Sequence, residues 1–420
     1  MRFLFLTQYY PPEIGAAQNR ISDQAQRFAD WGHEITVITA MPSYPIGRVF
    51  EGYRRRLLRE DVSGPIRILR TWTYVTESKT FILRLLNYFS FVLASVVIAL
   101  WKAGPQDAII VESPPLFLGL PGIMLSRLWR AKLVFNVSDL WPESAVAMGV
   151  LRSGSLIRFS TGLEEFIYQN CDLITGQTRG IIASIQSRIK HVPVLLLTNG
   201  IDSASFTEEN NREEMRCQLG FQKTDFVAGY TGRHGLAQGL EVILEAAERV
   251  SQHRDVVFGF FGDGPEKPAL EKIAQDKGLT NVRFFPPQPK ASMPRIMRAL
   301  DISIVPLKRH DLFKGALPSK LFESMGSGVP VVLTIEGEAR DLVEQAGGGI
   351  CVPPEEPDAL AQAILLLKSE PELRTSIGQN GRHYMITHYD RHDTAKRFEQ
   401  ALLQLLSGGG SATAPQAIQG

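Results

Sequence analysis

The sequence predicts an α/β protein built from two doubly wound parallel sheets, and three observations support this prediction. The chain has 420 residues, and a single core rarely extends that far, so two domains of roughly 200 residues are expected. Short segments of branched apolar residues alternate with helical segments, which is typical of buried parallel strands. The alternation starts at the N-terminus and starts again after residue 222.

The predicted strands can be read directly from the sequence. The first set is FLFLT, EITVITA, DAIIVES, KLVFNVS, DLITG and VLLLTN, and the second is DFVAGYTG, DVVFGFFGDG, NVRFF, ISIVPL and VPVVLT. Open parallel sheets bind ligands beyond the carboxyl ends of their strands. We therefore expect the functional residues at those ends, in a cleft between the two domains.

The domain boundaries follow from composition. We expect one domain over residues 1–199, a second over 200–386, and a C-terminal helix over 387–406 that can return to the first domain. The turn-rich segment NGIDSASFTEENN is a candidate hinge. The low-complexity tail 407–420 is expected to be disordered.

Composition and charge exclude several classes of protein. A hydrophobic content of 44% with 21% charged residues is typical of a globular chain, and a net charge of +1 gives no basis for a nucleic-acid partner. Three scattered cysteines, Cys171, Cys217 and Cys351, suit reduced thiols in a cytosol. The apolar run at the N-terminus is too short for a signal peptide, so a cytoplasmic protein is expected.

The segment KGALPSKLFESMGSGVPVV carries the most specific chemistry. Pro318 and Ser319 predict the start of a helix, where a proline and a capping hydroxyl are favoured. Lys320 and Glu323 then lie on one helix face. A helix N-terminus with a lysine suits a phosphate, and a glutamate one turn later can accept hydrogen bonds from ribose hydroxyls. The pair therefore predicts a nucleotide diphosphate site, and the alternative is a solvated surface ion pair.

Three further motifs place glycines after strands. YTGRHGLAQGLEVILEAA ends a strand at Gly232 and Arg233, and FGDGPE follows another strand. QYYPPEIGAAQNRI follows the first strand, and its Gly15 permits a close approach to the backbone before a helix begins.

Together these motifs resemble the retaining glycosyltransferases of family 4, which have the GT-B fold of two Rossmann-like domains. The resemblance covers nearly the whole chain and rests on PPEIGAAQNR, FADWGHEITVIT, LLLTNGID, YTGRHGLAQGLEVILEAA, FGDGPE and LPSKLFESMGSGVPVV. VSDLWPES and PSKLFE are most similar to bacterial N-acetylfucosamine-type transferases of O-antigen and exopolysaccharide assembly. The resemblance implies transfer of an amino or deoxy sugar from a UDP-sugar to a lipid-linked saccharide, without a cofactor.

The resemblance also implies residue roles, with the acceptor in the first domain and the donor in the second. Arg233 and Lys320 would hold the donor diphosphate, and Glu323 would hold the ribose. Asp139 lies where the family keeps a polar residue beside the acceptor, as a helper base or as a cap of the next turn. The implied catalytic residues are Asp139, Arg233 and Lys320. The implied donor-binding residues are Gly15, Gly232, Arg233, Gly262, Asp263, Gly264, Lys314, Gly315, Ala316, Leu317, Ser319, Lys320, Leu321 and Glu323.

Two positions depart from the family pattern. Gly315 stands where the first glutamate of the family's acidic pair is usual, and Gln238 stands where a lysine is usual. No Asp-x-Asp motif is present, so no metal is expected, and the leaving diphosphate would be stabilised by Arg233, Lys320 and helix N-termini.

The segment 81–102, FILRLLNYFSFVLASVVIALWK, is nearly long enough to span a bilayer, although Arg84 and Asn87 interrupt it. Residues 48–102 carry ten Lys and Arg against four Asp and Glu. We expect a helix of the fold that rests on the inner face of the cell membrane, so that the protein is peripherally attached. The alternatives are a buried helix and a true span.

The same residues also bear on three other functions. A nicotinamide-dependent oxidoreductase needs Gly-x-Gly-x-x-Gly after the first strand, where this chain has only Gly15. A UDP-sugar 2-epimerase of the same fold stays open, and so does a non-catalytic carbohydrate-binding protein, because Gly315 replaces the family acid.

Overall fold

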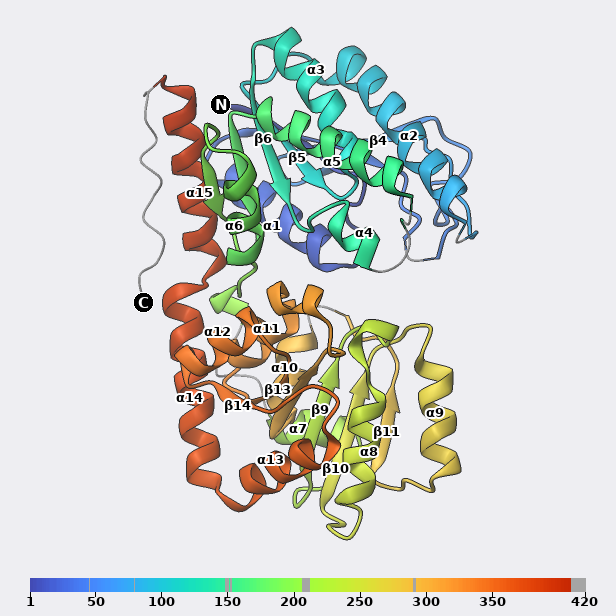
Figure 1. The fold of residues 1–420 in the computed structure, drawn as a ribbon, viewed down its shortest axis with the longest axis vertical. Coiled ribbons are helices and arrows are strands. Elements are labelled where there is room, and N and C mark those ends of the chain that lie inside the picture. Colours follow the sequence, from blue (N-terminus) through green and yellow to red (C-terminus); the bar gives the residue numbers. More distant parts are fainter. Residues whose placement is uncertain are drawn as a thin grey trace. The chain divides into compact units, whose positions relative to one another are not determined.

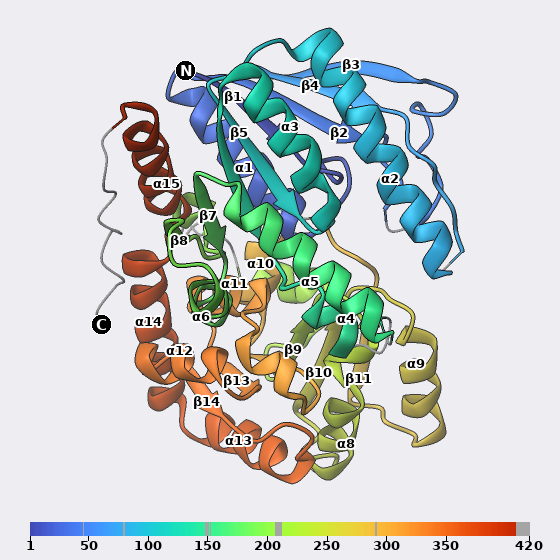
Figure 2. The ribbon, with the colours of Figure 1, turned by 45° about the horizontal axis from the view of Figure 1, so that its top comes forward.

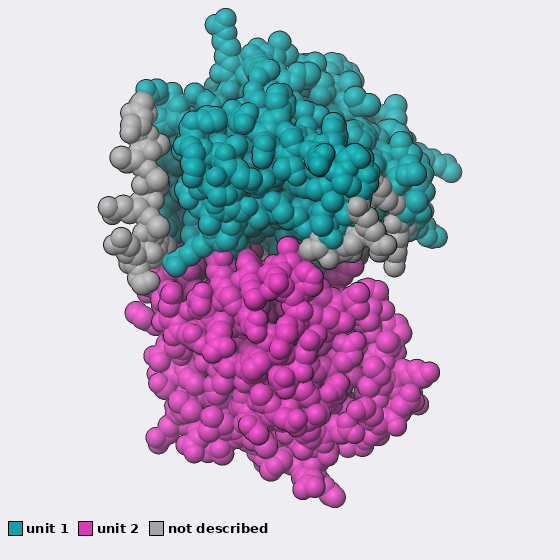
Figure 3. Space-filling model, in the orientation of Figure 1, with its two compact units in different colours: residues 1–198, 392–420 teal, residues 199–391 magenta. Residues whose placement is uncertain are grey.

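In the computed structural model, the chain forms two compact units, which are coloured separately in Figure 3. Unit 1 comprises residues 1–198 and 392–420, and unit 2 comprises residues 199–391. Residues 206–211 of the predicted hinge and residues 409–420 of the predicted disordered tail lie outside the described residues. The structure describes residues 1–44, 46–78, 80–147, 151, 153–205, 212–289 and 292–408.

Unit 1 contains an eight-stranded sheet in the order β3-β4-β2-β1-β5-β6-β7-β8. Figure 1 labels its strands β4, β5 and β6. All neighbouring strands are parallel except β3 and β4, which form an antiparallel pair at one edge. The strands are β1 (Arg2–Leu6), β2 (Glu34–Ala40), β3 (Leu58–Ser63), β4 (Ile66–Thr71), β5 (Ala108–Ser113), β6 (Lys132–Val137), β7 (Leu173–Gly176) and β8 (Val194–Leu196).

Helices pack against both faces of this sheet, so it is doubly wound. One core contains Phe91 of α2, Ile123 of α3 and Ile167 of α5. The other contains Phe28 of α1 and Phe398 of the C-terminal helix α15. The helices are α1 (Ala16–Asp30), α2 (Phe81–Ile98), α3 (Gly119–Trp129), α4 (Glu143–Ala147), α5 (Gly154–Gln169), α6 (Arg179–Arg188) and α15 (Arg391–Leu406).

The C-terminal helix α15 packs in unit 1, on the same side of the sheet as α1. The rings of Phe398 and Phe28 lie 5.7 Å apart, and His33 contacts the carboxylate of Glu399 at 2.8 Å. This helix begins at Arg391, four residues after the start expected from the sequence, because α14 continues to His388.

Unit 2 contains a six-stranded parallel sheet in the order β11-β10-β9-β12-β13-β14. The strands are β9 (Phe226–Thr231), β10 (Val256–Phe261), β11 (Val282–Phe285), β12 (Ile302–Pro306), β13 (Val331–Thr334) and β14 (Gly349–Cys351). The helices are α7 (Arg212–Gln218), α8 (Glu241–Arg249), α9 (Lys267–Asp276), α10 (Met293–Ala299), α11 (Ser319–Gly326), α12 (Glu338–Ala346), α13 (Pro357–Ser369) and α14 (Pro371–His388).

The strand orders show where each sheet can bind a ligand. In both sheets the chain first builds outward in one direction and then reverses, so the switch point lies between β1 and β5 in unit 1 and between β9 and β12 in unit 2. Ligands of open parallel sheets bind at the carboxyl ends of the strands beside this point. The predicted α/β class is confirmed, and a bound ligand is expected at these two switch points.

Candidate active site

In unit 2, the loops after β9 and β10 pack directly against each other. The His234 amide donates to the Asp263 carbonyl at 2.8 Å. Gly262 and Gly264 have φ of +145° and +159°. A Cβ at Gly262 would lie 1.9 Å from the Gly232 carbonyl oxygen, and one at Gly264 would lie 2.2 Å from that of His234. These two glycines are therefore required by loop packing, and their role in donor binding stays a prediction.

Lys320 extends from the first turn of α11 to the carboxyl end of β9. Its Nζ lies 3.8 Å from the centroid of the Tyr230 ring, a cation–π contact. A Cβ at Gly232 would lie 3.1 Å from that Nζ, so the absent side chain leaves room for the ammonium group. The Tyr230 hydroxyl donates to the Arg233 carbonyl at 2.6 Å. The structure thus brings Lys320, Gly232 and the exposed Arg233 together at the switch point of unit 2.

The environment of Lys320 favours an incoming anion. Desolvation lowers the pKa of Lys320 to about 7, and the Glu323 carboxylate opposes this shift. Among the described residues, no hydrogen bond or salt bridge to the Lys320 ammonium is found. Nearby, burial and the charges of Lys267 and Lys320 lower the pKa of His234 to about 4, so this imidazole is neutral at pH 7. A bound phosphate would act as the counter-ion that the Lys320 ammonium lacks among the described residues.

UDP affinity should therefore depend on pH through Lys320. A diphosphate favours the charged lysine, so its pKa must be higher in the complex than the value of about 7 in the free protein. The contribution of Lys320 to binding should be complete below about pH 7, and binding should weaken by up to about tenfold per pH unit between this pKa and the higher pKa of the complex. Calorimetry from pH 6.5 to 9, in buffers of different ionisation enthalpy, should show proton uptake. The same dissociation constant at pH 7 and pH 9 would contradict this assignment.

The N-terminus of α11 has no side-chain cap. Pro318 is the N-cap residue and makes no capping hydrogen bond, so the expectation that the Ser319 hydroxyl caps this helix is wrong. Leu321 is fully buried in the core of unit 2, and its amide donates to the Pro318 carbonyl at 3.0 Å. Its assignment to donor binding is corrected, because neither its side chain nor its amide can reach a ligand.

The segment 314–317 lies directly before α11. Lys314 pairs with Asp311 at 2.8 Å, and a Cβ at Gly315 would meet no atom within 4 Å. Gly337, which the sequence interpretation missed, has φ of +77°, and a Cβ there would lie 2.2 Å from the Lys314 carbonyl oxygen. Ala316 and Leu317 are half-buried. The role of this segment in sugar binding stays a prediction.

In unit 1, the loop after β1 is held by the buried Glu13. Its carboxylate accepts hydrogen bonds from the amides of Ser43 at 2.8 Å and Tyr44 at 2.7 Å. Gly15 follows as the N-cap of α1 with an extended backbone, and its carbonyl accepts from the Asn19 amide. The loop is thus ordered by its own contacts, and phosphate binding by Gly15 stays a prediction.

A buried polar network lies at the switch point of unit 1, at the ends of β5 and β6. Arg20 of α1 donates to Glu112 at 2.7 Å and to Ser138 at 2.8 Å. Asn136 and Ser138 also donate to the Glu112 carboxylate. The Arg20 and Glu112 side chains are 7% and 6% exposed, so the pair has little contact with water. This network fixes the residue that precedes Asp139.

Asp139 itself is exposed on unit 1. Desolvation by the surrounding protein raises its pKa to about 6, Glu112 adds to the rise, and Arg20 opposes it. Among the described residues, its carboxylate accepts no hydrogen bond, so the capping alternative finds no support. A carboxylate with this pKa is suited to accept a proton near neutral pH.

Glu112→Gln should destabilise unit 1 strongly. The substitution leaves Arg20 buried without its counter-ion, and removal of one partner of such a pair costs about 3 kcal/mol or more. Glu60→Gln is the matched control, because Glu60 pairs with Lys102 and Arg67 at the surface, where the loss should stay below about 1 kcal/mol. Denaturant unfolding measures both variants. Equal losses would show that the Arg20–Glu112 pair has no special role.

Comparison with known proteins identifies the chain. The family of glycosyl transferases group 1 matches residues 211–384, and the glycosyl transferase 4-like domain matches residues 15–200. The putative colanic acid biosynthesis glycosyl transferase WcaI of Escherichia coli (strain K12) is 30% identical over 387 residues, which cover 88% of this chain and 93% of WcaI. The chain is a group 1 glycosyltransferase.

Solved structures show the same fold as this glycosyltransferase. Sucrose-phosphate synthase from Thermosynechococcus elongatus matches with a TM-score of 0.75 at 18% identity, over 97% of this chain and 100% of that one. Anabaena HepE in complex with UDP-glucose matches with a TM-score of 0.72 at 19% identity, over 96% and 100%. The predicted GT-B fold is confirmed, and the N-acetylfucosamine-type specificity stays a prediction.

Several residues of the glycosyltransferase's candidate sites were not assigned from the sequence. Tyr230 and His234 lie within the quoted motif YTGRHG, but nothing in that motif indicates that a lysine ninety residues away packs on the tyrosine ring. Arg20 and Glu112 are 92 residues apart. The one available signal was a charged residue, Glu112, near the end of an otherwise apolar strand.

Proposed function

We propose that this glycosyltransferase moves an amino or deoxy sugar, such as N-acetylfucosamine, from a UDP-sugar to a lipid-linked saccharide in bacterial surface polysaccharide synthesis. The observation that carries the proposal is the Lys320 ammonium at the switch point of unit 2, beside Gly232 and the α11 N-terminus. The UDP-glucose complex of HepE supports the nucleotide, and the colanic acid function in the name of WcaI supports the polysaccharide.

In this proposal, the cations of unit 2 stabilise the leaving group. As the bond from the sugar to the diphosphate breaks, negative charge grows on the diphosphate, and Lys320 and Arg233 stabilise it. Glu323 accepts hydrogen bonds from the ribose. The acceptor hydroxyl enters on the face that the diphosphate leaves, so the anomeric configuration is retained. Its proton passes to the leaving phosphate or to Asp139 of unit 1. We propose that transfer needs no divalent metal ion, because the protein supplies the cations.

A thermal-shift panel with UDP, GDP and dTDP, followed by a transfer assay with and without EDTA, tests this proposal. We expect stabilisation by UDP and its sugars and activity that survives EDTA. Loss of transfer in EDTA that magnesium or manganese restores would contradict the phosphate assignments. Conversion of a UDP-sugar without an acceptor would favour the 2-epimerase, and UDP binding without any turnover would favour the carbohydrate-binding alternative.

We also propose that α2 attaches the protein to the inner face of the cell membrane. Residues Ile82–Ala103 form a helix that is long and apolar enough to cross a membrane, and 22% of its most apolar stretch is buried in the protein. Ile82, Leu93 and Val97 are at least 61% exposed on one side, whereas Phe91 and Ser95 are fully buried against the sheet. Figure 2 shows α2 along the surface of unit 1 beside α3, which adds the exposed apolar residues Leu120, Met124 and Leu128. Because one side of this helix packs on the sheet, the arrangement supports peripheral attachment rather than a transmembrane span.

Membrane extraction tests this attachment. Because one side of α2 belongs to the core of unit 1, the helix can insert only shallowly, and high salt or alkaline carbonate should release most of the protein from membranes. Protein that stays in the membrane pellet after both treatments would indicate a true span.

A further inference from the structure

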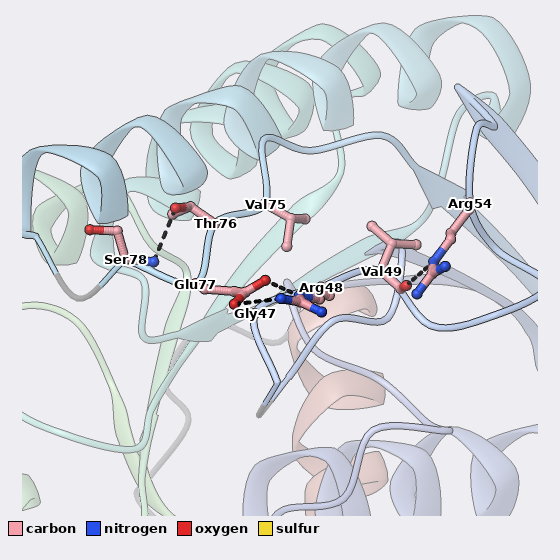
Figure 4. Close-up of a pocket in the computed structure, with 8 residues that line it drawn as sticks. All are labelled: Gly47, Arg48, Val49, Arg54, Val75, Thr76, Glu77 and Ser78. Atoms are coloured by element: carbon pink, nitrogen blue, oxygen red, sulfur yellow. Dashed lines mark hydrogen bonds and ion pairs between the residues drawn. The ribbon is translucent and has the colours of Figure 1, made fainter.

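Two adjoining hollows lie in unit 1 at the carboxyl ends of β2 and β4, away from the polar network of Arg20 and Glu112. The larger, drawn in Figure 4, has a volume of about 570 Å³ and is lined by Gly47, Arg48, Val49, Arg54, Val75, Thr76, Glu77 and Ser78. The smaller has a volume of about 320 Å³ and is lined by Met41, Val49, Tyr53, Arg54, Arg55, Arg56, Leu57, Trp72 and Thr73. The hollows share Val49 and Arg54, so they adjoin, and we call the two together the depression.

The charge of this depression is strongly positive. Four arginines line it against one carboxylate, Glu77, and that carboxylate already pairs with Arg48 (Figure 4). The Arg54 guanidinium donates to the Val49 carbonyl at 3.1 Å and so orders the loop. Within the described ranges, Arg55 and Arg56 are exposed and make no ion pair.

The neighbouring arginines differ from Arg55 and Arg56. Arg59 and Arg70 both pair with Asp61, at 2.6 and 2.7 Å, and both lie over the Tyr53 ring. These two therefore stabilise the fold. Arg55 instead has φ of +61°, a conformation uncommon for a residue with a Cβ and often found at ligand sites.

Apolar surface continues directly from the depression. Leu57 and Trp72, which line the smaller hollow, are 77% and 47% exposed. The segment 75–78 of the larger hollow leads into α2, whose exposed apolar stripe begins at Ile82. Basic groups thus adjoin exposed apolar side chains and the segment that leads into the apolar helix α2, which matches an amphiphile with an anionic head and a hydrocarbon chain.

We propose that this depression binds the diphosphate head of the lipid that carries the acceptor saccharide, with Arg55 and Arg56 as the phosphate contacts and the apolar face of α2 along the hydrocarbon chain. Guanidinium groups bind phosphate oxygens in a bidentate manner. The depression lies beyond the carboxyl ends of β2 and β4, at the same edge of the sheet as the switch point. This inference rests on the proposed function only in naming the lipid as the acceptor.

Binding of farnesyl diphosphate, with UDP saturating the donor site, tests the proposal on the full chain. Arg55→Gln/Arg56→Gln should raise the dissociation constant on the order of tenfold or more, because two charge-assisted contacts are lost. Farnesol and inorganic diphosphate should each bind much more weakly than farnesyl diphosphate. The matched control is Arg254→Gln/Lys272→Gln, which removes two exposed charges of unit 2 and should change nothing.

Vesicles of phosphatidylglycerol and of phosphatidylcholine distinguish the source of the phosphate. If the double variant loses binding to phosphatidylglycerol vesicles but keeps its affinity for farnesyl diphosphate, the arginines bind lipid headgroups and the proposal is overturned. An unchanged dissociation constant, or equal binding of farnesol, would also overturn it. UDP affinity and transfer to acceptor are measured on the same samples, so failure of the proposed function would be seen separately.

Discussion

Lys320→Ala should lower kcat/KM on the order of 10²-fold or more, and part of the loss should be in kcat. The ammonium lies at the end of β9 where we place the donor diphosphate, and its interaction grows stronger as the sugar leaves. Glu323→Gln should mainly raise the KM for the donor, because ribose hydroxyls do not change during the reaction. Steady-state kinetics and calorimetric titration with UDP measure both variants.

The control for Lys320 is Lys277→Ala, which removes a surface lysine paired with Glu248 and should leave the kinetics unchanged. Both site variants should keep the fold, since each side chain is only half-buried. Turnover and UDP binding equal to wild type in both variants would mean that neither Lys320 nor Glu323 contacts the donor.

Gly262→Ala should destabilise unit 2 and abolish UDP binding. The added Cβ would lie 1.9 Å from the Gly232 carbonyl oxygen at a φ that disfavours side chains, so the two loops beside Lys320 must separate. A cost of about 3 kcal/mol is expected for such strain. The melting temperature should then fall by about 6–12 °C.

The matched control is Gly315→Ala, since a Cβ there meets no atom within 4 Å. Its melting temperature should stay within about 1 °C of wild type. Thermal unfolding and UDP titration of the two variants provide the comparison. If Gly262→Ala melts like Gly315→Ala, the close packing of these loops is not required.

The sequence predicted the buried strands well because their signal is local. EITVITA and DVVFGFF are apolar runs between polar turns, and they form β2 and β10. The edge strand β3, LREDVS, was missed because three of its six residues are charged and no apolar alternation remains. β14 was missed because it has three residues, Gly349–Cys351, and is defined only by its pairing with β13.

The candidate site was predictable only in part, because only its local features leave a signal in the sequence. Pro318 marks the start of α11, and helical spacing then places Lys320 and Glu323 on one face. Contacts between distant segments had no local signal. The sequence could not show that Gly262 packs on Gly232, because the two residues are joined only by the pairing of β9 with β10.

A crystal structure of the chain with UDP tests the central claim most directly. The account predicts the diphosphate at the carboxyl end of β9, beside the N-terminus of α11, with a phosphate oxygen about 3 Å from the Lys320 Nζ. The Glu323 carboxylate should accept hydrogen bonds from the ribose. UDP bound elsewhere, with Lys320 still packed on Tyr230 and touching no phosphate, would contradict the account.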